Sequence, residues 1–379
     1  MSGIAPFGFR SKGKSKFTKR RPGPPTRVRS INVGDMKRRS FLKTIGAVPA
    51  LAAAPVVSSA SRPPRKVIVG TVMQAFWVEH PGLRNRLSEL GGIIDEMQVE
   101  SQRKYGRGMD IAILPECAVT GEAGLNSSLR AVPIRGDFSA KFGDKAREHR
   151  CYIVAPTYLY DSEKTVSNAA VLFGRKGEVA GIYRKVHLVV APEGRDFENG
   201  CAPGADVPVF DCDFGKLGIQ ICYDIEFDYG WSELARKGAE LIAFPTQSPQ
   251  TSHPACRAMH NRCYIVSSTW RSNASVFEPT GKIAARVLPP GRILVYEMDL
   301  SYAILPWHPK LKNGQAMRAK YGDKVGFHYY EDEDCGIFWS NDSSLPVAEM
   351  AKALRVPEAE ASLDRVRGVY HDAGVIGYR

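Results

Sequence analysis

The sequence LGIQICYDIEF, residues 217–227, contains a short apolar run that stops at a cysteine. Apolar runs of this length, rich in β-branched residues, are typical of fully buried β-strands. The carboxyl end of a strand is where an open sheet presents its functional side chains. We therefore expect Cys222 to be presented at the end of a buried strand.

Two other stretches share this design. In DIAILPECAVTG, residues 110–121, Glu116 follows an apolar run, and in GIYRKVHL, residues 181–188, Lys185 ends another. Taken singly, such a carboxylate or lysine is usually solvated, and a cysteine in an apolar strand usually belongs to the core. Together they supply the base, the cation and the nucleophile that acyl transfer through a thiol requires. We expect the three side chains to meet in one site.

The rest of the chain alternates strand-like runs with helical patterns, which indicates a layered domain with helices covering the faces of sheets. Helices are predicted at 83–105, 231–237 and 254–262. Strands are predicted at 66–72, 110–114, 151–159, 169–173, 179–183, 207–210, 217–222, 240–244, 264–269 and 293–299. From Trp307 onward we expect an irregular segment, followed by an amphipathic tail over 347–369.

The chain resembles the nitrilase superfamily of carbon–nitrogen hydrolases over about residues 66–300. Its signature blocks occur in order as LPECAVTG, YRKVHL and GIQICYDIEF, and CRAMHNRCYIV and FEPTGKIAARV resemble two further blocks. The resemblance implies an α+β fold, a four-layer αββα sandwich, for a hydrolase domain at 61–306. We expect residues 307–379 to form a C-terminal extension that covers this domain or reaches another protomer.

The resemblance also assigns roles to individual residues. It implies that Glu116 is the general base, Lys185 the cation that holds the oxyanion and Cys222 the nucleophile. Glu193 follows Lys185 at the distance at which amidase members carry a second glutamate, and it is expected to position substrate. The backbone N–H of Tyr223 is expected to face the oxyanion. We further expect Lys185 to favour the thiolate and lower the pKa of Cys222.

The expected reaction is hydrolysis of a small amide or N-carbamoyl compound without a cofactor. Tyr223 and Asp224 after the nucleophile favour an amide, because nitrile-cleaving relatives often carry Trp and Glu there. Nitrile hydrolysis, N-acyl transfer and a non-catalytic binding role remain alternatives, and His260 replaces a glutamate that is usual in the family. The family is commonly dimeric, so we expect a homodimer or a higher homo-oligomer.

The remaining histidines and cysteines point to no metal site. His187 and His253 are interpreted as structural residues, because a lone histidine is more often hydrogen-bonded than catalytic. The eight cysteines form no CxxC pair and show no zinc spacing. Cys201 and Cys212 remain candidates for a disulfide in an oxidising compartment.

The first 66 of the 379 residues carry the whole of the formal net charge of +12, because the remaining residues are slightly acidic, with 36 Lys/Arg against 39 Asp/Glu. No basic patch for nucleic acid is therefore expected on the folded domain. Residues 36–60 contain RRSFLK before a weakly apolar stretch and resemble a twin-arginine signal peptide. Such a leader predicts export through the twin-arginine machinery to the periplasm or another extracytoplasmic space. Residues 1–35 are expected to be a disordered basic leader, or an upstream stretch that is not translated, with Met36 as the first residue.

Overall fold

The computed structural model describes residues 59–76, 79–121, 130–162, 165–190, 194–375 and 377. The basic leader at 1–35 lies outside these residues, and so does nearly all of the stretch at 36–60 that resembles a signal peptide. No helix in the described ranges is long and apolar enough to cross a membrane.

The first sheet contains seven strands in the order β13-β1-β2-β4-β5-β6, with β3 paired to β4. The strands are β1 (Lys66–Val72), β2 (Ile111–Ile113), β3 (Val132–Pro133), β4 (Tyr152–Ser162), β5 (Thr165–Phe173), β6 (Val179–Arg184) and β13 (Ile293–Asp299). Strands β1, β2 and β4 are parallel, whereas β5 runs antiparallel to both β4 and β6. The carboxyl ends of β2 and β6 therefore lie at the same edge of the sheet, where β5 begins.

The second sheet contains six strands in the order β12-β11-β10-β9-β8-β7. They are β7 (Val209–Cys212), β8 (Gly215–Ile219), β9 (Leu241–Pro245), β10 (Tyr264–Ser268), β11 (Ala274–Phe277) and β12 (Ile283–Val287). Strands β8, β9 and β10 are parallel, so their carboxyl ends also share one edge.

Alternating side chains along the strands build three stacked cores. In β1, Val67 and Val69 face the second sheet, whereas Ile68 packs toward the helices. In β9, Ala243 faces the first sheet and Phe244 packs under the helices of the other side. This alternation follows from the two-residue period of a strand, and it explains why strands buried on both faces are continuously apolar.

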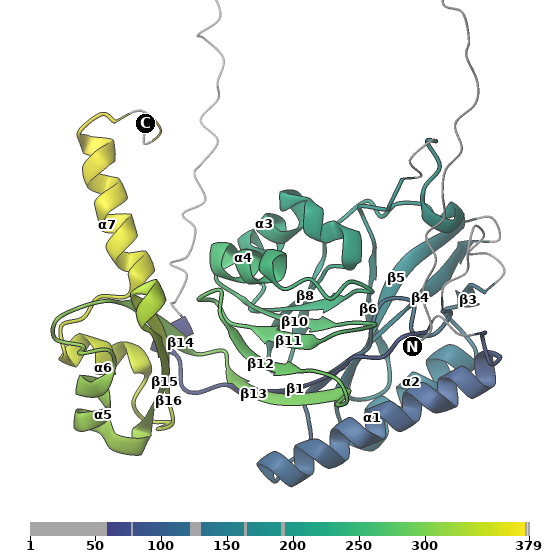
Figure 1. Cartoon of the computed structure of the whole chain (residues 1–379), viewed down its shortest axis with the longest axis horizontal. Coiled ribbons are helices and arrows are strands. Elements are labelled where there is room, and N and C mark those ends of the chain that lie inside the picture. Colours follow the sequence, from purple (N-terminus) through teal and green to yellow (C-terminus); the bar gives the residue numbers. More distant parts are fainter. Residues whose placement is uncertain are drawn as a thin grey trace, which may run out of the picture. The chain divides into compact units, whose positions relative to one another are not determined.

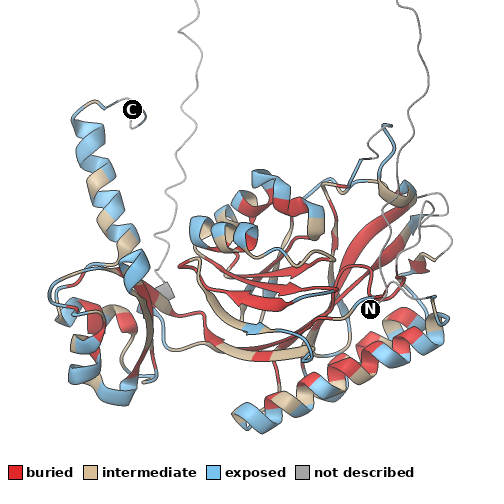
Figure 2. Cartoon of the chain, in the orientation of Figure 1, coloured by how far each residue is buried: buried red, intermediate tan, exposed pale blue. Residues whose placement is uncertain are grey.

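Two pairs of helices cover the outer faces of the sheets, which confirms the four-layer αββα sandwich (Figure 1). They are α1 (Leu83–Tyr105) and α2 (Asp137–His149) on the first sheet, and α3 (Asp228–Arg236) and α4 (Ser252–Asn261) on the second. Figure 2 shows buried residues along the central strands and on the sheet-facing sides of these helices. The predicted stripe of α1, with Leu87, Leu90, Ile94 and Met97, is buried as expected.

The irregular segment expected after Trp307 is instead a regular α/β unit with its own core. Its three-stranded sheet has the order β14-β16-β15. The elements are β14 (Tyr302–Pro306), α5 (Gln315–Tyr321), β15 (Val325–Tyr330), β16 (Cys335–Ser340), α6 (Val347–Ala353) and α7 (Ala359–Asp372). The two strands β15 and β16 were hard to recognise in the sequence, because aromatic residues and a charged turn obscure the alternation of buried and exposed positions. Val325 and Phe338 are buried, whereas the turn between the two strands is exposed.

The small core of this extension uses residues from outside 307–379. Strand β14 falls within the predicted hydrolase domain at 61–306, yet it pairs with β16 of the extension. Ala60, the last residue of the predicted signal peptide, is buried in the same core. Short 3₁₀ helices complete the described secondary structure at η1 (Ser59–Ser61), η3 (Glu198–Gly200), η4 (Cys222–Glu226), η5 (Gly322–Lys324) and η6 (Glu331–Glu333).

Candidate active site

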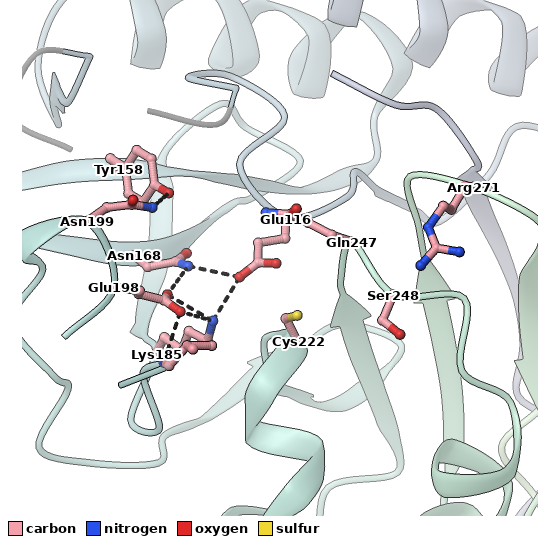
Figure 3. A pocket seen from close by; sticks show the side chains of 11 residues that line it. Glu116, Tyr158, Asn168, Lys185, Glu198, Asn199, Cys222, Gln247, Ser248 and Arg271 are labelled. Carbon is pink, nitrogen blue, oxygen red and sulfur yellow. Dashed lines mark hydrogen bonds and ion pairs between the residues drawn. The ribbon is translucent and has the colours of Figure 1, made fainter. Parts of the chain in front are cut away.

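The strand ends of both sheets converge on a cavity of about 400 Å³ that contains Glu116, Lys185 and Cys222 (Figure 3). The first sheet contributes residues from β4 and β5 and those that follow β2 and β6, and the second contributes residues that follow β8, β9 and β10. The lining residues are Glu116, Tyr158, Asn168, Lys185, Val189, Glu198, Asn199, Cys222, Gln247, Ser248 and Arg271. The three residues that the sequence predicted to meet therefore lie in one site.

Glu116 begins a tight turn just after β2. The residue is 2% exposed, and the next residue, Cys117, adopts a left-handed φ of 54°. The indole N–H of Trp270, which follows β10, donates a hydrogen bond of 2.8 Å to the Glu116 carbonyl oxygen. This bond ties the backbone of Glu116 to the second sheet across the cavity.

Cys222 occupies an elbow between a strand and a helical turn. Strand β8 ends at Ile219, earlier than the predicted strand end, and Cys222 begins η4 with a left-handed φ of 44°. Strain of this kind at a strand-to-helix turn presents a nucleophile above its sheet. The buried Asp224 carboxylate holds the elbow, because it accepts hydrogen bonds of 2.9 Å from the backbone N–H groups of Ile221 and His187.

Lys185, which is 1% exposed, lies between two carboxylates. Its Nζ donates hydrogen bonds of 2.9 Å to Glu116 Oε1, 2.9 Å to Glu198 Oε1 and 3.0 Å to Glu198 Oε2. Burial alone would lower the pKa of Lys185, but Glu116, then Cys222 and Glu198, raise it well above the usual value. The lysine is therefore a permanent cation in the cavity.

Asn168, near the start of β5, bridges the same two carboxylates. Its Nδ2 donates hydrogen bonds of 2.9 Å to Glu116 Oε1 and 2.9 Å to Glu198 Oε1. Lysine and asparagine together thus saturate one oxygen of Glu116. Figure 3 shows the second oxygen of Glu116 on the side of Cys222, where it can accept a proton.

Lys185 acts to lower the pKa of Cys222, as expected, but two larger effects outweigh it. Desolvation and, second, the nearby Glu116 carboxylate raise the pKa of Cys222 to about 12. Lys185 acts in the lowering direction, as do the Thr246 side chain and the Gln247 backbone that hydrogen-bond to the thiol, but these effects are smaller. The resting nucleophile is consequently a thiol that needs a base.

The second glutamate found beside Lys185 is Glu198, which the sequence analysis missed. Glu193, the residue predicted for this role, lies outside the described residues. An antiparallel β-bridge pairs Val190 with Phe197. It brings Glu198 beside Val189, whose backbone N–H donates a hydrogen bond of 3.0 Å to Glu198 Oε2. Spacing in the sequence could not identify this carboxylate, because several acidic residues follow Lys185 within a short distance. The course of the backbone decides which of them reaches the lysine.

Tyr223 and the two histidines lie outside the cavity lining. Tyr223 is 36% exposed, and its ring meets Phe227 edge to face at 5.7 Å. The imidazole of His187 pairs with Asp224 at 3.0 Å and stacks on Phe227, so the structural interpretation of this histidine holds. His253 is exposed, 3.6 Å from Glu226. The orientation expected for the Tyr223 backbone N–H stays a prediction.

The donor sets in the structure do not favour a bound metal. The two carboxylates of the cavity both form ion pairs with Lys185. In the described part of the chain, Asp95, Glu148 and His149 also come together on the outer helices, but Lys145 Nζ donates to Asp95 at 2.7 Å and to Glu148 at 2.8 Å. An ammonium already occupies the position that a cation would take.

Cys212 carries a free thiol, so no disulfide joins it to Cys201.

Comparison with known proteins gives a consistent picture. The family model for carbon–nitrogen hydrolases matches residues 84–305. The chain is 26% identical over 218 residues to omega-amidase NIT2-A of Xenopus laevis, covering 52% of this chain and 79% of that protein. It is 25% identical over 223 residues to deaminated glutathione amidase of Mus musculus, covering 52% and 69%.

Solved structures share the fold. Nit3 of Saccharomyces cerevisiae, described as a member of branch 10 of the nitrilase superfamily, superposes with a TM-score of 0.51 at 21% identity, covering 62% of this chain and 90% of that one. An amidase from Nesterenkonia sp. superposes with a TM-score of 0.52 at 19% identity, covering 63% and 92%.

Proposed function

The chain belongs to the carbon–nitrogen hydrolase family, and from that premise we propose that it hydrolyses a small linear amide or N-carbamoyl compound through a thioester on Cys222. One observation carries the proposal. A thiol on a strained elbow, a carboxylate with one oxygen turned toward it and a buried ammonium line the same small cavity. Nucleophile, base and oxyanion cation are the groups that this reaction needs.

In the first half of the reaction, Cys222 attacks the carbonyl carbon of the substrate. Because the pKa of the thiol is raised to about 12, its proton passes to Glu116 as the C–S bond forms. Lys185 and the backbone N–H of Tyr223 stabilise the oxyanion of the tetrahedral intermediate. Glu116 then gives the proton to the leaving nitrogen, so the C–N bond breaks, ammonia or an amine departs and the thioester remains.

In the second half, a water molecule attacks the thioester. Glu116 removes a proton from this water and returns it to the sulfur as the C–S bond breaks. A carboxylic acid leaves and the Cys222 thiol is restored. The same base thus serves both halves in opposite directions, as general acid–base catalysis requires.

Two groups of the cavity support an amide rather than a nitrile. Asn168 Oδ1 is buried and has no hydrogen-bond partner within the described ranges, so a substrate N–H can supply the missing donor. Glu198 is a second carboxylate acceptor beside it. An amide nitrogen carries such donors and a nitrile nitrogen carries none. The relatives that are named as amidases agree with this choice.

A panel of amides, N-carbamoyl compounds and nitriles, scored for release of ammonia or amine, tests the proposal. Cys222→Ala, Glu116→Gln and Lys185→Met should each reduce turnover by orders of magnitude, because members of a catalytic unit act together. His253→Ala, on an exposed residue outside the cavity, is the control and should behave as wild type. Near-normal turnover by folded Cys222→Ala would overturn the mechanism. A nitrile turned over more than about tenfold faster than its matched amide, ~1.4 kcal/mol in the barrier, would remove the amidase assignment.

A further inference from the structure

The cavity has two walls with opposite hydrogen-bonding states. On the wall built by the first sheet, Glu116, Asn168, Lys185 and Glu198 are joined by hydrogen bonds (Figure 3). The facing wall belongs to the second sheet and carries Gln247, Ser248 and Arg271. Within the described part of the chain, the side chains of these three residues form no hydrogen bond or ion pair.

Arg271 is placed accurately although its side chain is exposed. Its neighbour Trp270 donates to the Glu116 carbonyl oxygen at 2.8 Å. The Arg271 carbonyl oxygen accepts a hydrogen bond of 2.8 Å from the Asn273 backbone N–H, and the Asn273 side chain donates to Pro249 O at 2.9 Å. The turn that carries the guanidinium is thus fixed both to the catalytic base and to the loop after β9.

The same loop contacts the nucleophile. Its Thr246 side chain and Gln247 backbone hydrogen-bond to the Cys222 thiol, and Ser248 follows directly. Figure 3 shows Ser248 between Cys222 and Arg271, so a molecule whose reacting carbon lies at Cys222 can extend past Ser248 toward Arg271. In Figure 3, the Arg271 guanidinium lies across the cavity from Lys185 and turns toward Ser248.

The two walls also differ in charge: the catalytic wall is acidic and the facing wall is basic. Glu116 and Glu198 outnumber the single cation Lys185 on the catalytic wall, so this end repels a substrate carboxylate. Arg271 places an unpaired positive charge on the other wall. A guanidinium binds a carboxylate through two parallel N–H donors, a geometry that a lysine cannot reproduce. The cavity therefore distinguishes the two ends of an extended substrate.

We propose that Arg271, assisted by Ser248 and Gln247, binds a carboxylate at the end of the substrate remote from the scissile bond. The substrates are then monoamides or N-carbamoyl derivatives that carry a free carboxylate. This inference rests on the proposed function, because it assigns the substrate class of the same site.

Matched substrates test the inference. Succinamate carries a terminal carboxylate, and its methyl ester is the uncharged counterpart with the same amide. Wild-type protein should show a kcat/KM for succinamate at least about tenfold higher than for the ester, the discrimination expected of a charge-assisted contact. Arg271→Ala should bring this ratio close to one, and Arg271→Lys should restore only part of it. The control is Arg84→Ala. It removes an exposed arginine at the start of α1 that does not line the cavity, so it should keep the wild-type ratio.

The outcomes separate this inference from the proposed function. A ratio near one in wild type, or a ratio that Arg271→Ala leaves unchanged while both amides are hydrolysed, overturns the carboxylate site and leaves the hydrolase intact. Binding of glutarate, measured by calorimetry on Cys222→Ala protein, gives an answer independent of turnover. Addition of Arg271→Ala should weaken that binding by about tenfold or more. Equal affinity in both proteins contradicts the inference even if no amide in the panel is hydrolysed.

Discussion

At the scale of single residues, Asn168 keeps two carboxylates close together. Glu116 Oε1 and Glu198 Oε1 each accept one hydrogen bond from Asn168 Nδ2 and one from Lys185 Nζ. Two like charges this close repel each other, and these donors offset the repulsion. Asn168 therefore contributes a neutral donor where a second cation would change the charge of the site.

Asn168→Asp should impair catalysis more than Asn168→Ser. The aspartate adds a third carboxylate beside a single lysine, so the cluster takes up a proton and the acid limb of the kcat/KM profile moves to higher pH. The fall in kcat should reach about 10²-fold or more, the usual worth of a positioned general base. Steady-state kinetics across pH measure both effects. An aspartate variant with a wild-type profile would show that the bridge is only structural.

Alkylation of Cys222 should reveal the raised pKa of its thiol. The thiolate is the reactive form, and with the pKa raised to about 12 its fraction increases about tenfold per pH unit through the neutral range. The rate of iodoacetamide labelling at Cys222, followed by peptide mass mapping, should rise steadily from pH 6 to pH 10. A labelling rate that levels off near pH 7 would indicate that Lys185 makes a stable thiolate, as the sequence had suggested.

The catalytic residues could be predicted because each follows an apolar run in an ordered set of motifs. The ends of three strands place Glu116, Lys185 and Cys222 in one site, and sequence patterns locate strand ends well. Glu198 could not be predicted, since it reaches Lys185 through the path of a loop. The lowering effect of Lys185 on the pKa of Cys222 was predicted, but the net shift is upward, because desolvation inside the cavity outweighs it and is invisible in a sequence.

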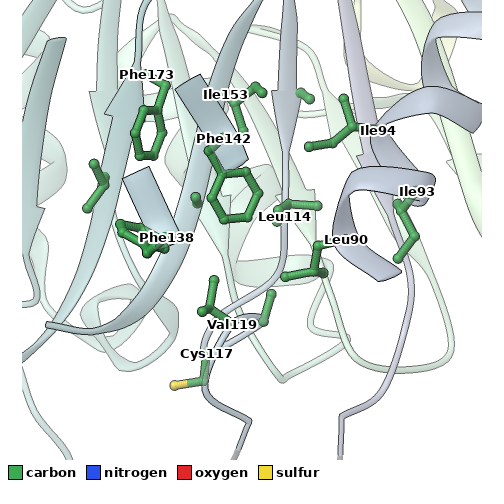
Figure 4. Packing of buried hydrophobic residues seen from close by; sticks show 14 of the residues in the cluster. Leu90, Ile93, Ile94, Leu114, Cys117, Val119, Phe138, Phe142, Ile153 and Phe173 are labelled. Carbon is green, nitrogen blue, oxygen red and sulfur yellow. The ribbon is translucent and has the colours of Figure 1, made fainter. Parts of the chain in front are cut away.

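At the scale of elements, helix α1 and strands β1 and β13 have the predicted bounds, whereas helix α2 was missed. Helix α1 carries a continuous stripe over 23 residues, but α2 has only Phe138, Phe142 and Ala146 as apolar buried positions, with Gly143 between them. Figure 4 shows the two aromatic rings packed near Phe173 of the sheet beneath. Burial against the sheet, and not local propensity, therefore makes this helix.

Phe142→Ala should destabilise the fold strongly. Phe142 is fully buried, and its ring lies 5.4 Å from that of Phe138 and 5.7 Å from that of Phe173. Removing a buried aromatic ring leaves a cavity that costs about 3–5 kcal/mol in the free energy of unfolding. Chemical denaturation measures the loss. Asp144→Ala on the exposed side of α2 should change it by less than about 1 kcal/mol, and equal effects would contradict the packing described here.

At the scale of the whole molecule, the residues that the structure describes begin at Ser59, next to the expected end of the leader. Ala60 is buried with Ala303, Phe338 and Met350 in the core of the C-terminal extension. Cleavage after Ala60 would remove this contact, so we propose that a signal peptidase cuts before it. N-terminal sequencing of exported protein checks this, and Ala60 absent from the mature chain would argue against it.

The expected homo-oligomer stays a prediction, which light scattering can test.

We propose that RRSFLK directs twin-arginine export, and this motif lies outside the described residues. Replacing Arg38 and Arg39 together by lysine should retain a tagged protein in the cytoplasm, because the machinery recognises the arginine pair. Hydrolysis by the purified variant should equal that of wild type, since Glu116, Lys185 and Cys222 are unchanged. Normal export of the double variant in a fractionation experiment would exclude the twin-arginine route.

The most direct test of the account is the mass of the covalent intermediate. The folded protein is mixed with an amide substrate, quenched in acid within the first turnovers and digested for peptide mass mapping. We predict that the peptide containing Cys222 carries the acyl group of the substrate, a mass equal to the amide minus ammonia, and that the Cys222→Ala protein carries none. Release of ammonia without any adduct on Cys222, together with turnover by the Cys222→Ala protein, would contradict the account.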